Sequence, residues 1–264
     1  MDINYEKKIF IKPALKAVFN KLEKSPLVAA VLLYGSYATN QNSKNSDYDI
    51  LVILYKNISI SSSFSYIDGV PADIFYTSIK NISSINCKKI SLDTKDDWIA
   101  YWIQTGYVCF DKTGIIAKFK KKKRTRIIDK TKKYNCLYRL NHDFIQNSRF
   151  YNSNNFDDKI IFQIKLSHSI SQILPIFFCL NDMSWRGEKF ALQYIKRNNL
   201  RFYNLYSFCL LSSVDNKFKS YGKVARYMTK QFGGLWKKNI SIDSSQEMQN
   251  KNKGKSFWDK LINK

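Results

Sequence analysis

The first third of the chain combines one amphipathic stretch with three short apolar runs. Apolar residues recur at helical spacing over residues 11–22, at Ile11, Leu15, Val18, Phe19 and Leu22. Pro13 suits the first turn of a helix, where its missing N–H leaves no hydrogen bond unmade. The three apolar runs predict strands at Val28–Tyr34, Asp49–Tyr55 and Val70–Tyr76. Pro71 limits the last run to a strand start or an edge. The order predicts a small sheet packed on helices.

The rest of the chain has helical rather than alternating patterns. Apolar residues follow helix-like spacing over Tyr134–Phe150, Ile160–Leu180 and Gly187–Asn198. The polar stretch Asn152–Asp158 predicts a turn between the first two helices. We therefore expect a helical bundle here. The tail after Trp236 is rich in Lys, Asn, Ser and Gln and is predicted to be mobile.

The positive charge of the chain is concentrated in this second part. The 264 residues carry 44 Lys+Arg and 21 Asp+Glu, a formal net charge of +23. Residues 1–112 account for only +2, and residues 113–264 for +21. We therefore predict a first domain at 1–112, a helical domain at 113–238 and a polar tail at 239–264. The basic run Lys118–Arg126 is interpreted as a linker or a solvated first helical turn. A charge excess of this size favours an anionic partner such as a nucleotide or RNA.

The remaining composition favours a cytoplasmic globular protein. The five cysteines are scattered without a C-x-x-C pair, which argues against a disulfide framework or a zinc site and fits a reducing cytosol. The N-terminus is acidic and polar, unlike a signal peptide. The longest apolar stretch, Ile173–Leu180, is far short of the ~20 residues of a membrane-spanning helix. We therefore expect no membrane partner.

Three carboxylates stand out among the predicted strands. Asp47 and Asp49 lie two residues apart at the start of one strand, so both side chains point to the same face. Two adjacent negative charges are costly without a cation, and hard oxygen ligands suit Mg²⁺. Asp73 lies within a later apolar run and completes a three-carboxylate cluster if its strand pairs beside the first. Such a cluster can hold two metal ions.

Gly35 and Ser36 end the strand that precedes this pair. Glycine lets the backbone approach a ligand closely. The N–H and hydroxyl of Ser36 can hold phosphate oxygens. Each of these features is common by itself, but their order along the chain is far more specific.

In this order they resemble the DNA polymerase β-type nucleotidyltransferase superfamily. The motif GSxAR(G)…SDxDhhV of its small bacterial members, in which h is apolar, reads GSYATN…SDYDILV here, and the resemblance covers Leu32–Tyr76. Thr39 and Asn40 depart from it, because they stand where those members usually have Arg and Gly. Two later segments, WRGEKFALQYI (Trp185–Ile195) and FGGLW (Phe232–Trp236), are similar to the helical domain of bacterial relatives that include aminoglycoside nucleotidyltransferases.

The resemblance implies a fold, a reaction and a set of site residues. The fold class would be α+β, a small mixed sheet with helices followed by an all-helical bundle. The reaction would be Mg²⁺-dependent transfer of a nucleoside monophosphate, AMP from ATP, onto a hydroxyl with release of pyrophosphate. Asp47, Asp49 and Asp73 would be catalytic residues and ligands of two Mg²⁺ ions. Nucleotide would be bound in the cleft between the domains by Gly35, Ser36, Arg186, Glu188 and Lys189.

The acceptor is left open by the sequence. A small hydroxylated molecule such as an aminoglycoside is polycationic, which fits the basic second part poorly. A tRNA or other RNA 3′ end would suit that charge. A protein hydroxyl is a third possibility, as in antitoxins that adenylylate a toxin. The R-x-x-x-x-H signature of such toxins is absent at Arg139, because Phe144 follows five residues later. A non-catalytic nucleic-acid-binding protein on a transferase fold is the alternative from another class.

Overall fold

A five-stranded mixed sheet forms the centre of the first of two units. The computed structural model describes residues 11–57, 61–127 and 129–236, and the chain divides into Met1–Ile127 and Ile128–Lys264. The strand order is β3-β4-β2-β1-β6. Strands β2 and β4 pair in parallel, and the other neighbours are antiparallel. The strands are β1 (Val28–Tyr34), β2 (Tyr48–Leu54), β3 (Ser62–Ile67), β4 (Val70–Ser78) and β6 (Tyr107–Asp111).

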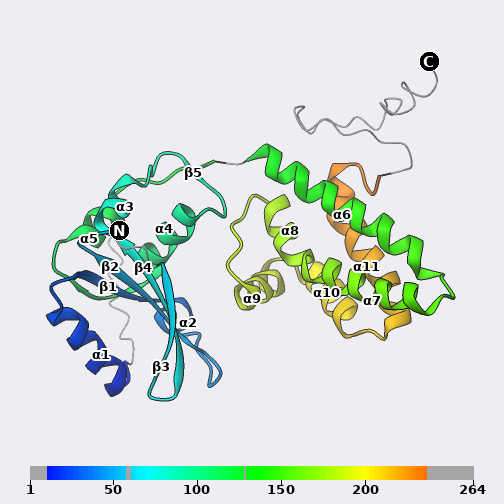
Figure 1. Ribbon diagram of the computed structural model, residues 1–264. Coiled ribbons are helices and arrows are strands. Elements are labelled where there is room, and N and C mark those ends of the chain that lie inside the picture. The colour runs from blue at the N-terminus through cyan, green and yellow to red at the C-terminus, as the bar shows by residue number, and fades with distance from the viewer. Residues whose placement is uncertain (1–10, 58–60, 128, 237–264) are drawn as a thin grey trace. The chain divides into compact units, whose positions relative to one another are not determined.

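Helices cover both faces of this sheet (Figure 1). Leu15 and Phe19 of α1 pack on one face against alternate residues of β1 and β2. Side chains of α3, α4 and α5 pack on the other face in a second core, which contains Leu32 and Leu51. The helices are α1 (Pro13–Lys24), α2 (Gly35–Ala38), α3 (Ile79–Ser84), α4 (Lys95–Thr105) and α5 (Ile115–Lys120). The predicted small mixed sheet with helices is confirmed.

Two strands of the sheet carried no clear pattern in the sequence. Strand β3 is an edge strand, exposed along almost its whole length, so it lacks the apolar alternation of a half-buried strand. The five residues of β6 are all half-buried and show no alternation either. Pro71 lies at the start of β4, next to Val70, as its missing N–H requires.

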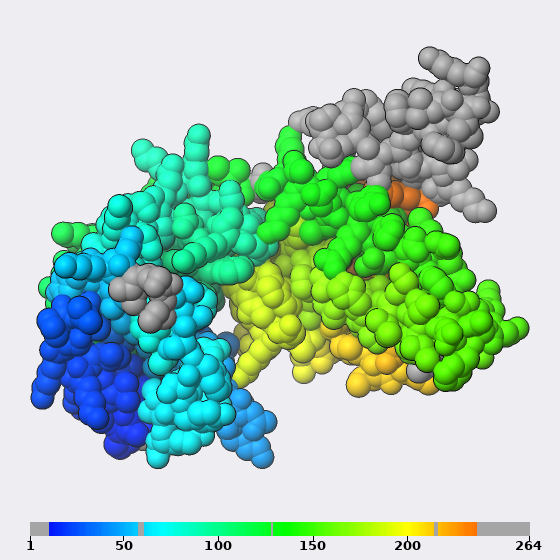
Figure 2. Space-filling view, in the orientation of Figure 1, coloured from blue at the N-terminus to red at the C-terminus, as the bar shows by residue number. Residues whose placement is uncertain are grey.

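Within the described residues, the second unit is built of helices only. Its core brings together side chains from all six α-helices, among them Leu140, Phe178 and Phe202. They are α6 (Lys130–Tyr151), α7 (Phe156–Ser171), α8 (Ile173–Leu180), α9 (Glu188–Asn198), α10 (Leu200–Leu211) and α11 (Val214–Thr229), followed by the short 3-10 helix η1 (Lys230–Phe232). The predicted bundle is thus confirmed, although the helix expected over Ile160–Leu180 is two helices that meet at Gln172. Figure 2 shows the surface of both units in the same orientation, with the N-terminal helix α1 in dark blue.

The basic run at residues 118–126 is part of the first unit and not a linker. Its first residues complete α5, where Phe119 is buried in the core with α3 and α4. Its end forms β7 (Arg126–Ile127), which pairs in parallel with β5 (Ile90–Ser91). The division between the units therefore falls after Ile127, beyond residue 112, where the positive charge of the chain rises sharply. The tail proposed at 239–264 lies outside the described residues.

One described stretch, Phe156–Leu180, is long and apolar enough by composition to cross a membrane. It consists of α7 and α8, and 44% of its most apolar window is buried. The buried side chains of α8, such as Ile173 and Phe178, belong to the core of the second unit. One such stretch is weak evidence of a membrane span, because core helices pass the same test.

Candidate active site

Three carboxylates meet on one face of the sheet, the face covered by α3, α4 and α5. Asp47 and Asp49 flank Tyr48, whose side chain is buried on the opposite face. The parallel register of β2 and β4 places Asp73 directly beside Asp49. One carboxylate oxygen from each of the three lies within 4.8 Å of the others. The structure therefore brings together the three residues that the sequence singled out.

The turn after β1 requires a glycine for two reasons. Gly35 has a φ of +66°, in the left-handed region that L side chains rarely adopt. A Cβ atom at this position would overlap the carboxylate of Asp49. Gly35 thus lets the backbone pass directly beside the acidic cluster.

Ser36 follows in α2 with a buried hydroxyl. Its Oγ has no hydrogen-bond partner among the described residues. A buried hydroxyl without a partner is costly, because it has lost its hydrogen bonds to water. A ligand oxygen at this place would supply the missing bond.

Thr39 and Asn40, the two departures from the resembling motif, have local structural roles. The hydroxyl of Thr39 donates to the carbonyl oxygen of Gly35 at 3.0 Å and so closes the short helix. Asn40 has a φ of 55°, a conformation that Asn tolerates better than most residues and glycine best. Asn is therefore compatible with the left-handed backbone at this position.

Sequence reasoning missed Tyr34, the last residue of β1. Tyr34 pairs with Asp49 across β1 and β2, and its ring stacks on Trp102 of α4 at 4.5 Å between centroids. Burial, and then the negative charges of Asp49, Asp73 and Asp47, raise the pKa of the Tyr34 hydroxyl well above its usual range. The hydroxyl keeps its proton and remains a donor beside the acidic cluster. In the sequence, only the position of Tyr34 directly before Gly35 could have indicated that it belongs to the site.

The chemistry of this donor set fits a divalent cation. Three closely spaced carboxylates offer hard oxygen ligands and repel one another without a positive charge between them. Oxygens of the bound substrate and water complete the coordination of Mg²⁺ in sites of this kind. The residues present are therefore suited to Mg²⁺.

Comparison with known proteins identifies the first unit. Residues 16–111 match the family Polymerase beta, Nucleotidyltransferase. These residues form a polymerase β-type nucleotidyltransferase domain. The match includes all three carboxylates, Gly35 and Ser36, and the chain is accordingly an enzyme of the nucleotidyltransferase class. The predicted relationship to this superfamily and the predicted fold class are both confirmed.

The chain is also similar to a protein of known structure. The crystal structure of a nucleotidyltransferase-like protein from Exiguobacterium sibiricum is similar over 83% of this chain and 74% of that chain, with 12% sequence identity and a TM-score of 0.43. No curated protein matches the sequence of the chain.

The other predicted nucleotide-binding residues lie in the second unit, outside the nucleotidyltransferase domain. Glu188 begins α9 directly after Gly187, which has a φ of 82°. The Arg186 guanidinium lies over the ring of Phe190, 5.3 Å from its centroid. Lys189 is the second residue of the same helix. A role of Arg186, Glu188 and Lys189 in nucleotide binding stays a prediction.

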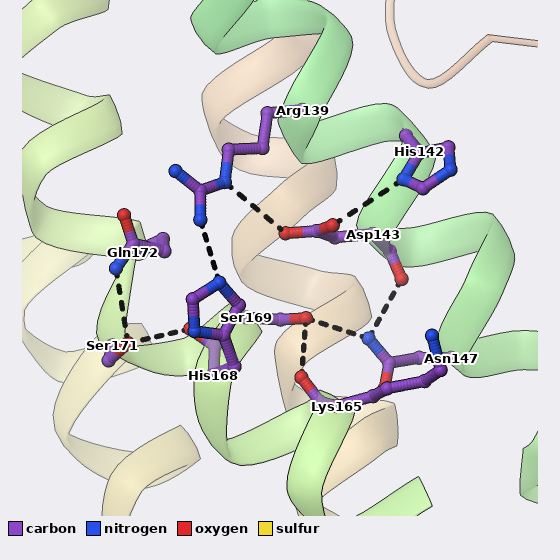
Figure 3. Close-up of polar contacts among 9 residues, drawn as sticks. All are labelled: Arg139, His142, Asp143, Asn147, Lys165, His168, Ser169, Ser171 and Gln172. Atoms are coloured by element: carbon purple, nitrogen blue, oxygen red, sulfur yellow. Dashed lines mark hydrogen bonds and ion pairs between the residues drawn. The ribbon is translucent and has the colours of Figure 1, made fainter. Parts of the chain in front are cut away.

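A polar cluster between α6 and α7 contains both histidines of the chain (Figure 3). Arg139 Nη2 lies 2.7 Å from His168 Nε2, so the histidine accepts from the guanidinium. His142 Nδ1 lies 3.6 Å from a carboxylate oxygen of Asp143. Asn147, deeper in the bundle, donates to Ser169 Oγ at 2.8 Å. The contacts of Arg139 with His168 and of Asn147 with Ser169 join the two helices, whereas His142 contacts its neighbour on α6.

Proposed function

We propose that the chain transfers a nucleoside monophosphate, AMP from ATP, onto a hydroxyl acceptor and releases pyrophosphate, in the cytoplasm of a bacterium. The observation that carries this proposal is the cluster of Asp47, Asp49 and Asp73 within a nucleotidyltransferase domain. In the reaction the acceptor oxygen bonds to the α-phosphorus, and the bond from that phosphorus to the pyrophosphate oxygen breaks. The bonding electron pair leaves with pyrophosphate.

Each site residue would have a role in this reaction that follows from its position. Asp47 and Asp49 would hold two Mg²⁺ ions, and Asp73 would complete the site on the acceptor side. Bound Mg²⁺ would supply positive charge to the triphosphate and to the attacking oxygen. The Asp73 carboxylate would also take the proton of the acceptor hydroxyl. The N–H and unpaired Oγ of Ser36 would hold the terminal phosphates, and the proton on Tyr34 would keep a donor beside the carboxylates.

A labelling experiment tests this proposal. The full chain is incubated with Mg²⁺, α-³²P-labelled nucleoside triphosphates and cell extract, and the labelled molecule is identified. We expect label from ATP to enter a hydroxyl-bearing acceptor with release of pyrophosphate, and Asp47→Asn to abolish both. No labelled product and no pyrophosphate from any of the four triphosphates would contradict the proposal.

The alternative from another class, a non-catalytic nucleic-acid-binding protein, is distinguished by the same assay. It predicts RNA binding without any labelled product. The presence of all three carboxylates in close proximity favours the enzyme.

A further inference from the structure

Two large aromatic side chains are exposed on the edge strand β3 of the first unit. Phe64 is 61% exposed and Tyr66 is 64% exposed, and their rings meet edge to face with 5.4 Å between centroids. Strand β3 lies at the end of the sheet, beside β4 (Figure 1). Exposed apolar residues on an edge strand favour association with other chains, so they are informative where they occur. We call Phe64 and Tyr66 the aromatic pair.

The strand register places the aromatic pair on the same face of the sheet as the three carboxylates. In the antiparallel ladder of β3 and β4, Phe64 lies directly opposite Asp73, and Tyr66 lies opposite Pro71. Directly opposite residues in such a ladder project to the same face, with Cβ atoms about 4.5–5.5 Å apart. Ile67 projects to the other face and is buried in the core with α1. Phe64 is therefore the neighbour of Asp73 on the side away from β2.

The order of the strands separates the phosphate side of the site from the acceptor side. Across the sheet the strands follow in the order β1, β2, β4 and β3. Ser36 follows the first of them, and Asp49 and Asp73 lie on the next two. In the proposed reaction the terminal phosphates lie beside Ser36 and the acceptor hydroxyl lies beside Asp73. The aromatic pair on β3 is thus next to the acceptor and on the far side from the phosphates.

The chain around the aromatic pair carries no positive side chain. Residues 61–78, which include β3, the following turn and β4, contain no Lys, Arg or His and two carboxylates, Asp68 and Asp73. This stretch is an exception in a chain with a formal net charge of +23. Phosphates of an acceptor would meet negative charge here and find no cation on these two strands. The charge favours an acceptor without phosphate groups at this place.

We propose that Phe64 and Tyr66 bind the acceptor and select one whose reacting hydroxyl is carried on, or next to, an uncharged ring. This rests on the proposed function. The flat face of the ring would pack on the aromatic pair, with its hydroxyl turned toward Asp73. Aromatic side chains suit this contact because they bury a large apolar area and lose little conformational entropy. The aromatic pair would determine specificity, whereas the transfer itself would depend on the carboxylates.

Transfer of label from α-³²P-labelled ATP to the acceptor in a dilution series of cell extract tests the aromatic pair. The full chain is used with Mg²⁺, and the initial rate against extract concentration gives an apparent KM and a limiting rate. The variants are Phe64→Leu, which loses the flat ring but stays apolar, Tyr66→Ala, and Tyr66→Phe, which keeps the ring. The matched controls are Tyr55→Ala, which removes a ring 43% exposed directly after β2, and Ser65→Ala on the other face of β3.

We expect Phe64→Leu and Tyr66→Ala to raise the apparent KM by about tenfold or more, because the surface on which the acceptor ring packs is lost. Tyr66→Phe and both controls should stay within about twofold of the wild type. Affinities for ATP and Mn²⁺, measured by calorimetry without extract, should be unchanged in every variant. An unchanged apparent KM in both ring variants would overturn the inference. An equal loss of ATP affinity would do the same, because it would assign the rings to the nucleotide.

The chemistry of the acceptor is tested with the wild type. The apparent KM should change by less than about twofold between about 50 and 200 mM salt, whereas an acceptor held by several phosphate contacts would lose about a thousandfold or more in affinity. The labelled product, isolated and analysed by mass spectrometry and NMR, should carry its AMP on a hydroxyl of, or next to, an uncharged ring. An acyclic or phosphate-bearing acceptor would overturn the inference.

The same assay separates this inference from the proposed function. No labelled product with the wild type at any extract concentration contradicts the proposed function, and the inference that rests on it falls as well. Labelled product with the wild type, and an equal signal from Phe64→Leu and Tyr66→Ala at limiting extract, overturns the present inference alone.

Discussion

The carboxylates of Asp47 and Asp49 repel each other in the protein without metal, because both project from the same face at the start of β2 and a third carboxylate adjoins them. This repulsion lowers the stability of the metal-free protein. A bound cation would instead be attracted by these negative charges. Replacing one carboxylate by a neutral group should therefore not destabilise the metal-free protein, but it should weaken metal binding.

Asp47→Asn should therefore abolish nucleotide transfer and weaken Mn²⁺ binding by at least about tenfold. The melting temperature of the metal-free protein should hold or rise, because one repelling charge is gone. Calorimetry and thermal unfolding measure the two effects, with Glu23→Gln on α1 as a control that removes one exposed charge elsewhere. Near wild-type activity in Mg²⁺ would rule out Asp47 as a ligand.

Ser36→Ala should weaken ATP binding more than Mn²⁺ binding. The hydroxyl has no partner among the described residues, so its removal costs the folded protein little. A hydrogen bond to a charged phosphate contributes about 1.5–3 kcal/mol, or roughly tenfold to a hundredfold in affinity. Titration calorimetry with ATP decides the matter, and exposed Ser83→Ala in α3 is the control. An unchanged ATP affinity would remove Ser36 from the phosphate site.

Among single residues, the sequence predicted those site residues that form a distinctive pattern along the chain. Two carboxylates at spacing i, i+2 and a Gly-Ser pair at a strand end could be recognised before the structure was known. Tyr34 could not, because a tyrosine ending an apolar strand is typical of a core residue. Only the register of β1 against β2 shows that it lies beside Asp49.

At the scale of elements, the junction of β1 and α2 is tightly constrained at Gly35. Gly35 combines a left-handed backbone with direct contact to the carboxylate of Asp49, whereas Gly69, in the turn between β3 and β4, has a φ of +72° and open space around it. Both glycines thus have a left-handed backbone, but only Gly35 also lies directly against another side chain.

Gly35→Ala should accordingly cost more than Gly69→Ala. The left-handed backbone costs each variant about 1 kcal/mol of unfolding free energy, and Gly35→Ala must in addition displace Asp49. We expect a larger fall in melting temperature for Gly35→Ala, together with a loss of Mn²⁺ affinity that Gly69→Ala does not show. Equal behaviour of the two variants would contradict the close packing of Gly35 against Asp49.

Elements with a one-sided apolar pattern were predictable and the others were not. Helix α1 and strand β1 occupy the expected residues, whereas the exposed edge strand β3 had no pattern to recognise. The basic run was misinterpreted because a row of lysines is typical of a solvated linker. What holds it, the contacts of Arg124 and Arg126 to α4, is tertiary and leaves no local signal.

At the scale of the whole molecule, each unit has its own core. Phe202 of α10 is fully buried in the second unit, and its ring stacks on Phe177 at 4.1 Å and lies 5.8 Å from Tyr227. The cluster of carboxylates belongs entirely to the first unit. Damage to the second core should therefore leave the metal site intact.

Phe202→Ala should destabilise the second unit by about 3–5 kcal/mol, because it leaves a cavity in the core. We expect an early unfolding transition by calorimetry while Mn²⁺ binding at the carboxylates persists at lower temperature. Phe208→Ala on the same helix is the control, since that side chain is 60% exposed. Loss of Mn²⁺ affinity in Phe202→Ala would show that the two units are not independent.

The charge pattern predicted two parts but placed their boundary too close to the N-terminus. The jump in net charge after residue 112 begins with lysines of α5 and its following segment, which pack in the first unit. Charge marks the surface chemistry of a segment, whereas a domain boundary follows the core into which its apolar side chains fit. Phe119, buried among α3 and α4, was the residue that could have corrected the boundary.

The central claim is that Asp47, Asp49 and Asp73 form the metal site at which a nucleoside triphosphate reacts. Crystals grown with Mn²⁺ and an ATP analogue that cannot be cleaved between the α- and β-phosphates test it most directly, through the anomalous signal of manganese. We predict manganese peaks about 2.1 Å from carboxylate oxygens of Asp47 and Asp49, bridging to phosphate oxygens next to Ser36. A nucleotide bound with its metal away from these carboxylates, or no manganese peak beside them at saturating concentration, would contradict the account.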